Sequence, residues 1–167
     1  MKDSYGYDGM STKILKQSIP YSSSPWTHLC NLMISTGIFP TRLKFAEIKP
    51  LYKKDEIAGT SNYRPISLLT SFSKIFEKII YTRLICHLNH SHILVDEQFG
   101  FRTKSSMDLA SCKLINDVLT SLNNKLFVGG VFCDLQKAFD CVDHDILLSK
   151  MNWSGISGKE YKLLSSY

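Results

Sequence analysis

Apolar residues recur at helical spacing along much of this chain. The clearest stretch spans residues 71–89, where apolar side chains follow one another at intervals of three and four and form one face. A second stretch, residues 105–122, opens with Ser105 and Asp108 in the spacing of a capping box. We expect both stretches to be helices. The apolar positions are Phe72, Ile75, Phe76, Ile79, Ile80, Leu84 and Leu88 in the first, and Met107, Ala110, Leu114, Val118 and Leu122 in the second.

The face of the first helix should pack on a core shared with the second helix, with Phe72, Phe76, Ile79 and Ile80 as its contacts. A shorter helix is expected ahead of them, with Ser24 as its N-cap, Pro25 at its first position and Gly37 just past its end.

Extended segments are expected between and after these helices. Residues 43–52 and 62–69 favour strands that form a basic antiparallel pair, with Pro50 ending the first strand or placing it at an edge. Residues 126–134, rich in β-branched and aromatic residues, favour a buried strand. Two further helices should follow, one over about 143–151 and one from Ser157 to the last residue.

The predicted strand at 126–134 delivers Asp134 to its C-terminal end. Phe139 and Asp140 follow within one turn. A carboxylate at a strand end, followed by a turn and a bulky residue, suits a site that holds a divalent metal beside a sugar-phosphate. The simpler alternative is that Asp134 is a turn or helix N-cap residue.

Composition bounds the class of protein. The 167 residues suffice for one domain or a piece of one. No apolar run approaches the roughly 20 residues that span a bilayer, and the N-terminus has no signal-peptide pattern. The five cysteines are odd in number and form no C-x-x-C pair, which favours reduced thiols in an intracellular protein, in cytoplasm or nucleus.

Positive charge is concentrated in the middle of the chain. Residues 41–90 contain nine Lys or Arg and four Asp or Glu and so have a net charge of +5. This is the same as the net charge of the whole sequence. A basic segment ahead of the acidic region around Asp134 is typical of a protein that binds a polyanion together with a metal ion. Solvated lysines without a ligand would give the same distribution.

Four segments, taken in order, carry a family resemblance. They are Phe39-Pro40 with the sequence LKFAEI at 43–48, NYRPISLL at 62–69, QFGFR at 98–102 with Ser106, and DLQKAFD at 134–140 with Val142 and His144. Together they resemble the reverse transcriptase of non-LTR, LINE-type (jockey-like) retrotransposons. Gly155-Ile156 and Ser166-Tyr167 are similar to the next segment of that family.

The resemblance implies an α+β fold, a right-hand polymerase represented by its fingers and by the first palm strand and helix, and truncated after them. Residues 1–38 would be an N-terminal helical extension of the fingers, 39–125 the fingers, and 126–167 the start of a palm that is incomplete and lacks a thumb. The partners implied are an RNA template, a DNA primer and deoxynucleoside triphosphates, with no membrane; the oligomeric state is left open.

The resemblance also implies roles for single residues. Asp134 would be the catalytic ligand of two Mg²⁺ ions, assisted by the carbonyl of Leu135. Phe139, next to Ala138, would lie under the sugar of the incoming nucleotide and exclude a 2′-hydroxyl. Arg64 would reach the triphosphate, with Lys53 or Lys54 assisting. The template and nucleotide pocket would include Gln98, Phe99, Gly100, Phe101 and Arg102.

Plainer interpretations of these residues stay open. Arg64 could stabilise the turn before Pro65, and Phe99 and Phe101 could be core residues. His144 has no partner at ligand spacing and is interpreted as structural. The acids Asp140, Asp143 and Asp145 are interpreted as capping and surface residues of the following helix.

The sequence departs from the family at one point: it contains no Asp-Asp pair, which family members carry on a later palm hairpin. One carboxylate does not hold two magnesium ions against their hydration shells, so we expect this chain alone to be inactive. The alternatives are a non-catalytic nucleic-acid-binding remnant, a group II intron-type maturase fragment, and an unrelated α/β enzyme.

Overall fold

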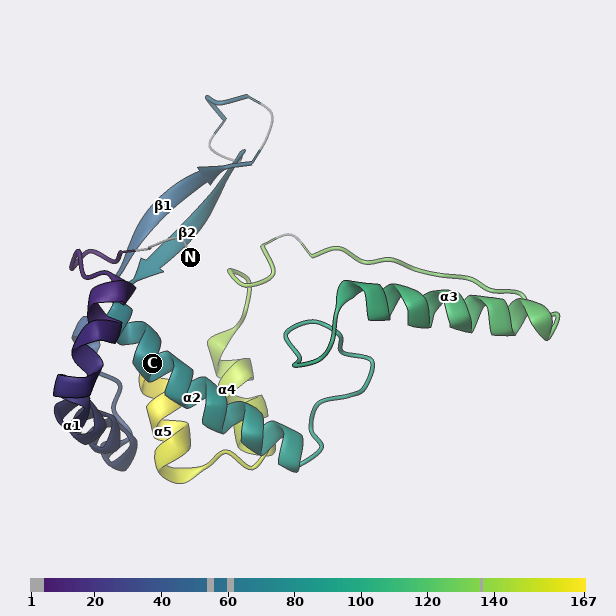
Figure 1. Cartoon of the computed structure of the whole chain (residues 1–167). Coiled ribbons are helices and arrows are strands. Elements are labelled where there is room, and N and C mark those ends of the chain that lie inside the picture. Colours follow the sequence, from purple (N-terminus) through teal and green to yellow (C-terminus); the bar gives the residue numbers. More distant parts are fainter. Residues whose placement is uncertain (1–4, 54–55, 60–61, 136) are drawn as a thin grey trace. The chain divides into compact units, whose positions relative to one another are not determined.

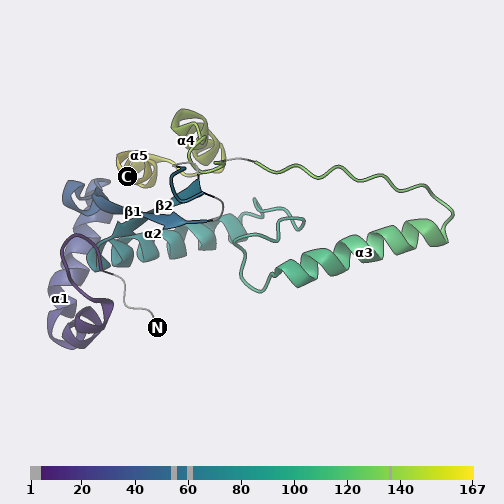
Figure 2. The ribbon, with the colours of Figure 1, turned by 90° about the horizontal axis from the view of Figure 1, so that it is seen from above.

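The computed structural model of the chain describes residues 5–53, 56–59, 62–135 and 137–167. Figure 1 and Figure 2 show their elements in two perpendicular views. The chain divides into two units, one of residues 5–86 with 144–167 and one of residues 87–143. The elements are α1 (Thr12–Thr36), the 3₁₀ helix η1 (Thr41–Lys44), β1 (Ala46–Tyr52), β2 (Tyr63–Leu69), α2 (Ser71–His90), α3 (Met107–Asn123), α4 (His144–Trp153) and α5 (Gly158–Ser166).

Helices and a small sheet in one chain agree with the α+β class. In the part of the chain that the structure describes, no helix has both the length and the apolar character needed to cross a bilayer.

Helix α1 begins far earlier than the sequence pattern indicated. Its N-cap is Ser11, whose side chain accepts a hydrogen bond from the backbone N–H of Ile14. The prediction of a start at Ser24-Pro25 is therefore wrong, although the end at Gly37 is confirmed. Burial of Leu15 provides the packing that holds the earlier turns, which a local start signal does not report.

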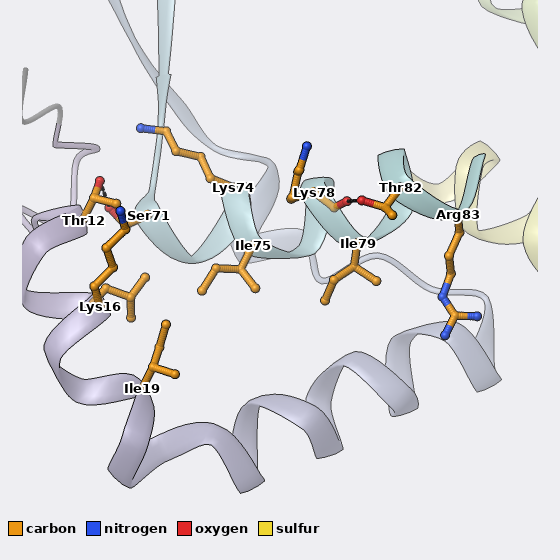
Figure 3. A pocket seen from close by; sticks show the side chains of 11 residues that line it. Thr12, Lys16, Ile19, Ser71, Lys74, Ile75, Lys78, Ile79, Thr82 and Arg83 are labelled. Carbon is orange, nitrogen blue, oxygen red and sulfur yellow. Dashed lines mark hydrogen bonds between the residues drawn. The ribbon is translucent and has the colours of Figure 1, made fainter. Parts of the chain in front are cut away.

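Two prolines, Pro20 and Pro25, lie inside α1. A proline in a helix interior lacks the N–H for the ladder and clashes with the preceding turn, so it bends the axis. Figure 3 shows the axis of α1 changing direction just beyond Ile19. The bend separates an N-terminal arm from a longer arm that returns beneath α2.

Gly37 lets the end of α1 approach α5 closely. Its φ of 68° lies in the left-handed region, and a Cβ at this position would lie 2.9 Å from the carbonyl oxygen of Lys159. Two residues on, the backbone N–H of Phe39 donates to the hydroxyl of Ser166 at 2.7 Å. The turn after α1 is therefore fixed to the last helix.

The core of the first unit forms around Phe76 of α2, which is 1% exposed. Its ring lies edge-on to those of Trp26 and Phe39, and Trp26 also stacks on Phe72 at 4.6 Å. Burial raises the pKa of the Cys30 thiol in the same cluster. The other buried members are Cys30, Met33, Phe39 and Leu163, with Ile79 and Ile80 partly buried against them.

Helix α2 and its apolar face are thus as predicted. Within the first unit the face packs on α1, Phe39 and α5, and a core shared with α3 of the second unit stays a prediction. No residue of α3 is buried, and the side chain of Met107 is 84% exposed. The repeat of apolar positions shows that a helix has a face to bury, but it does not identify the partner.

Buried hydroxyl groups connect the start of α2 to the rest of its unit. Thr70 caps the helix by accepting from the backbone N–H of Ser73 at 3.1 Å. The hydroxyl of Ser73 donates to the carbonyl of Leu43 at 2.8 Å, and that of Ser71 donates to the carbonyl of Met10 at 3.0 Å. These bonds satisfy polar groups that burial would otherwise penalise.

Strands β1 and β2 form the antiparallel hairpin that the sequence predicts, in a register that runs from Ala46 opposite Leu69 to Tyr52 opposite Tyr63. The first strand begins later than predicted because residues 41–44 form a 3₁₀ turn. Pro50 pairs with Pro65 in the middle of the hairpin. Both strands of a two-stranded sheet are edge strands, so the missing N–H groups are tolerated there.

The strand predicted at 126–134 is not formed. The only sheet among the described residues is β1–β2, and Figure 2 shows residues 126–135 as an extended trace. Val131 is 92% exposed and Phe132 is 83% exposed. A strand requires a neighbour that pairs with its backbone, and no described segment provides one here.

The remaining helices agree with the sequence pattern within a few residues. α3 begins one residue later than expected, since its cap is Ser106, which accepts from the N–H of Leu109, and not Ser105. α4 and α5 fall where they were predicted, with Ser157 as the N-cap of α5.

We predict that Phe76→Ala lowers the free energy of unfolding by about 3–5 kcal/mol, because it leaves a cavity where three elements meet. Urea denaturation followed by circular dichroism measures the change. The matched control is Phe132→Ala, which removes an exposed ring and should shift the midpoint little. Equal midpoints for the two variants would contradict this account of the core.

Candidate nucleotide and nucleic-acid site

One face of the β1–β2 hairpin is basic. Leu51 pairs with Arg64, and the N–H of Lys53 donates to the carbonyl of Asn62 at 2.8 Å, which continues the same pairing by one step. Because side chains alternate across a strand, Lys53 and Arg64 lie on the same face. Lys49 shares this face. The hairpin therefore brings together two of the cations that the sequence assigned to the triphosphate.

The charges of this face are accessible. Lys49, Lys53 and Arg64 are all exposed, and Lys49 lies 3.7 Å from the carboxylate of Glu47. Among the described residues, Arg64 forms no ion pair, and no hydrogen bond ties its guanidinium to the turn at Pro65. The turn-stabilising interpretation of Arg64 is thus without support, while a guanidinium facing solvent can bind phosphate.

The opposite face of the hairpin is apolar and aromatic. The rings of Tyr52 and Tyr63 lie 5.7 Å apart, and the hydroxyl of Tyr63 donates to the carbonyl of Ile57 at 2.9 Å. This bond anchors the loop that follows β1. Lys54, the other candidate in that loop, lies outside the described residues.

Sequence reasoning missed Lys49 as a member of this basic face. The available signal was its spacing, since Lys49 and Lys53 are four residues apart in an extended segment and so point to one side. Pro50 obscured that signal, because a proline suggested that the strand ended between them.

The predicted template segment, residues 98–102, is a turn in the second unit. Arg102 donates to the carbonyl of Val95 at 2.6 Å and lies 3.7 Å from the carboxylate of Asp96. The side chain of Gln98 donates to the carbonyl of Gly100 at 3.2 Å. In this structure, then, Arg102 and Gln98 hold the turn together.

The two aromatic residues of this turn differ in exposure. Phe99 is half-buried, with the ammonium of Lys113 at 6.0 Å from its ring centroid, whereas Phe101 is 82% exposed with a φ of 61°. A backbone hydrogen bond, and then the charge of Lys113, lower the pKa of Glu97 beside them. The interpretation of Phe101 as a core residue is therefore wrong.

Phe139 contacts the template segment. Its ring lies edge-on to the ring of Phe101, with the centroids 6.1 Å apart. The turn that carries it contains Lys137 at a φ of 51°, and the N–H of Asp140 donates back to the Lys137 carbonyl at 2.9 Å. Within the second unit, two segments singled out from the sequence, 98–102 and 134–140, thus meet through one aromatic pair. Phe139 is itself 78% exposed.

Asp134 lies on the extended segment ahead of that turn and is exposed, as are Leu135 and Ala138. It does not stand at the end of a strand, because no strand forms there. Asp145 lies in the first turn of α4, where a carboxylate is favoured by the helix dipole, and this agrees with its interpretation as a helix-start acid.

The residues that the structure describes do not make up a metal centre. No group of three His, Cys, Asp or Glu side chains among them is placed to hold an ion. Asp134 offers one carboxylate and Leu135 one carbonyl, whereas hard divalent ions take six or more oxygen ligands. Arg64 belongs to the first unit and Asp134 to the second, so a pocket common to both stays a prediction.

Comparison with known proteins decides the family. Residues 51–167, which include the hairpin from Leu51 onward, the 98–102 turn and the 134–140 turn, match the family described as reverse transcriptase (RNA-dependent DNA polymerase). The chain belongs to this reverse transcriptase family. The resemblance to reverse transcriptases seen in the sequence is therefore confirmed.

The similar proteins come from non-LTR mobile elements of flies. The chain is 36% identical to the probable RNA-directed DNA polymerase from transposon BS of Drosophila melanogaster, over all of this chain and 18% of that protein. It is 35% identical to the RNA-directed DNA polymerase from mobile element jockey of the same organism, over 72% of this chain and 13% of that protein. The chain therefore spans less than a fifth of the length of these relatives.

We predict that Arg102→Ala speeds amide hydrogen exchange in residues 95–102 several-fold, because the turn loses a hydrogen bond and a charge contact worth about 1 kcal/mol. Exchange followed by mass spectrometry measures it. Thr103→Ala, an exposed neighbour outside the bonding pattern, is the control. Unchanged exchange in Arg102→Ala would show that this arginine does not hold the turn.

Proposed function

We propose that this chain is the nucleotide-binding and template-binding segment of an RNA-directed DNA polymerase, which adds deoxynucleotides to a primer 3′ end during retrotransposition. The observation that carries the proposal is the basic hairpin face, on which Arg64 and Lys53 lie together. Both residues fall within the region of the family match. A planar guanidinium pairs bidentately with phosphate oxygens, and an adjacent ammonium adds charge to the same site.

The proposed division of the chain follows the sequence motifs. Residues 1–38 would be a helical extension of the fingers, 39–125 the fingers, and 126–167 the start of the palm. Phe139 would lie under the sugar of the incoming deoxynucleotide, and the turn from Gln98 to Arg102 would border the template. The contact between the rings of Phe139 and Phe101 supports a common position for these two segments.

Asp134 is proposed as one ligand of the two Mg²⁺ ions, with the carbonyl of Leu135 beside it. Magnesium supplies charge stabilisation for phosphoryl transfer when it is bound. The described residues do not complete such a site, so the further oxygen ligands would come from other parts of the polymerase. The partners proposed are an RNA template, a DNA primer and deoxynucleoside triphosphates, in an intracellular compartment.

A non-catalytic nucleic-acid-binding protein is the second candidate. It is favoured by the basic hairpin together with the absence of a three-residue metal cluster among the described side chains. The similarity to the fly mobile-element polymerases favours the retrotransposon branch over an intron maturase.

We predict that the chain binds single-stranded RNA with an affinity that falls steeply between about 50 and 200 mM salt, because each phosphate contact releases a counterion. Neutralising Lys53, Lys54 and Arg64 to Gln should reduce the slope of log K against log salt by up to about 2, at roughly 0.7 per lost contact. Fluorescence anisotropy with a labelled RNA of mixed sequence measures both slopes.

The matched control neutralises Lys13, Lys125 and Lys159, which are three exposed lysines outside the hairpin. This variant has the same net charge and should retain most of the slope. Equal loss of slope in the two triple variants would mean that the hairpin is not the binding face.

We also predict that the 167-residue chain alone does not extend a primer. A single carboxylate cannot offset the repulsion between two divalent cations, and catalytic groups that act as a unit leave little activity when part of the set is missing. The assay is primer extension with magnesium and deoxynucleotides, with Asp134→Ala as the control for contamination. Extension that disappears in Asp134→Ala would show that the remaining ligands are supplied within this chain or by a second copy.

A further inference from the structure

Helices α1 and α2 enclose a groove with a volume of about 580 Å³ (Figure 3). Its floor is apolar and comes from both helices. Ile75 and Ile79 point into the space between the helices, and Ile19 faces them from α1. All lining residues belong to the first unit. The apolar floor consists of Leu15, Ile19, Ile75 and Ile79.

The groove exists because α1 bends. Beyond Ile19 the axis turns at Pro20, so the next part of α1 does not cover the side chains at 75 and 79. The returning arm of α1 contacts α2 through Trp26, which stacks on Phe72. Ile19 is left 41% exposed. The space between the helices therefore follows from the bend of α1 next to Pro20.

The charged side chains that line the groove are all cations. Lys16 and Arg83 mark its two ends, whereas the side chains of Lys74 and Lys78 leave α2 on the side away from α1. The described lining residues include no carboxylate. Glu77 of α2 is not among them and instead accepts a hydrogen bond from Tyr167. A cation at each end of an apolar floor favours an anionic occupant.

The shape and the floor select the kind of anion. The lining of α2 runs from Ser71 to Arg83, which corresponds to about 18 Å along a helix axis. A phosphodiester backbone would satisfy the cations but would leave the apolar floor uncovered. A helix with an apolar stripe and acidic flanks satisfies both, as in the helix-in-groove mode of recognition.

We propose that this groove binds an amphipathic helix of a partner protein, about three turns long. Its apolar stripe at positions i, i+3, i+4 and i+7 would pack on Ile19, Ile75 and Ile79, over the buried Leu15. Glutamate or aspartate residues toward its two ends would pair with Lys16 and Arg83. The proposal does not rest on the polymerase assignment, because none of the lining residues belongs to the hairpin or to residues 98–102 and 134–140.

The test is fluorescence anisotropy of the full chain with a labelled, stapled helical peptide that carries leucines at the stripe positions and glutamates on the flanks. Ile19→Ser should weaken binding at least ten-fold. Ile14→Ser is the matched control, because it removes an isoleucine that is 56% exposed on the same helix but outside the groove. Circular dichroism verifies that both variants fold.

A charge exchange tests the electrostatic part. The double variant Lys16→Glu with Arg83→Glu should lose at least ten-fold in affinity for the glutamate peptide and gain affinity for the same peptide with lysines in place of glutamates. The control is Lys13→Glu with Lys159→Glu, which changes the net charge equally outside the groove. Its affinity for the glutamate peptide should not fall, and its affinity for the lysine peptide should not rise. Glutamate and lysine peptides that bind the unaltered chain alike would overturn the proposal.

Single-stranded RNA provides the competing outcome. The proposal would be overturned, and the groove would be a nucleic-acid surface, if three results came together. RNA would displace the glutamate peptide, and RNA binding would be lost in Lys16→Glu with Arg83→Glu. RNA binding would be kept when Lys53, Lys54 and Arg64 are neutralised. RNA that binds with the groove occupied by peptide would support separate sites.

Discussion

The first unit depends on the burial of Phe76, because its ring lies in the buried cluster to which α1, the turn after α1, α2 and α5 all contribute. α1 reaches it through Trp26, Cys30 and Met33, the turn after α1 through Phe39, and α5 through Leu163. The elements come from opposite ends of the chain, so their association carries a large loop-closure cost that only a shared apolar contact offsets. The hydroxyl hydrogen bonds at the start of α2 then set the position of the hairpin.

The β1–β2 hairpin presents candidate binding residues although it has no buried core of its own. Neither of its faces is covered, so alternation separates cations from aromatic rings instead of interior from surface. The register therefore matters for binding: a slip of one residue would move Arg64 away from Lys53 to the opposite face. Pairing between Tyr52 and Tyr63 and the bond from Tyr63 to Ile57 fix the register at the loop end, beside Lys53 and Arg64.

Much of this architecture could be predicted from local sequence, and the failures share a cause. The helix periodicity at 71–89, the hairpin and the stop at Gly37 depend on neighbours close in the chain, and each is confirmed. The start of α1 and the strand at 126–134 depend on distant segments. Ser24-Pro25 is a valid local start signal, but burial of Leu15 outweighs it. For the site, the family resemblance assigned Arg64, with Lys53 or Lys54, to one ligand, while the contact of Phe101 with Phe139 had no sequence signal.

The exposed segment around Asp134 also depends on distant parts of the chain, because a strand needs a partner strand. Residues 128–135 have the composition of an interior strand, yet Val131 and Phe132 face solvent because no described strand pairs with them. A metal site is most effective when the backbone of its ligands is held in place before the ion is bound, and strand pairing is one way to hold it. The turn at 137–140, by contrast, is already closed by its own hydrogen bonds and by the ring of Phe101. The turn of Phe139, which is proposed to contact the nucleotide sugar, is thus formed by local contacts. The segment of Asp134, which is proposed to bind metal, lacks the strand pairing that would fix its position.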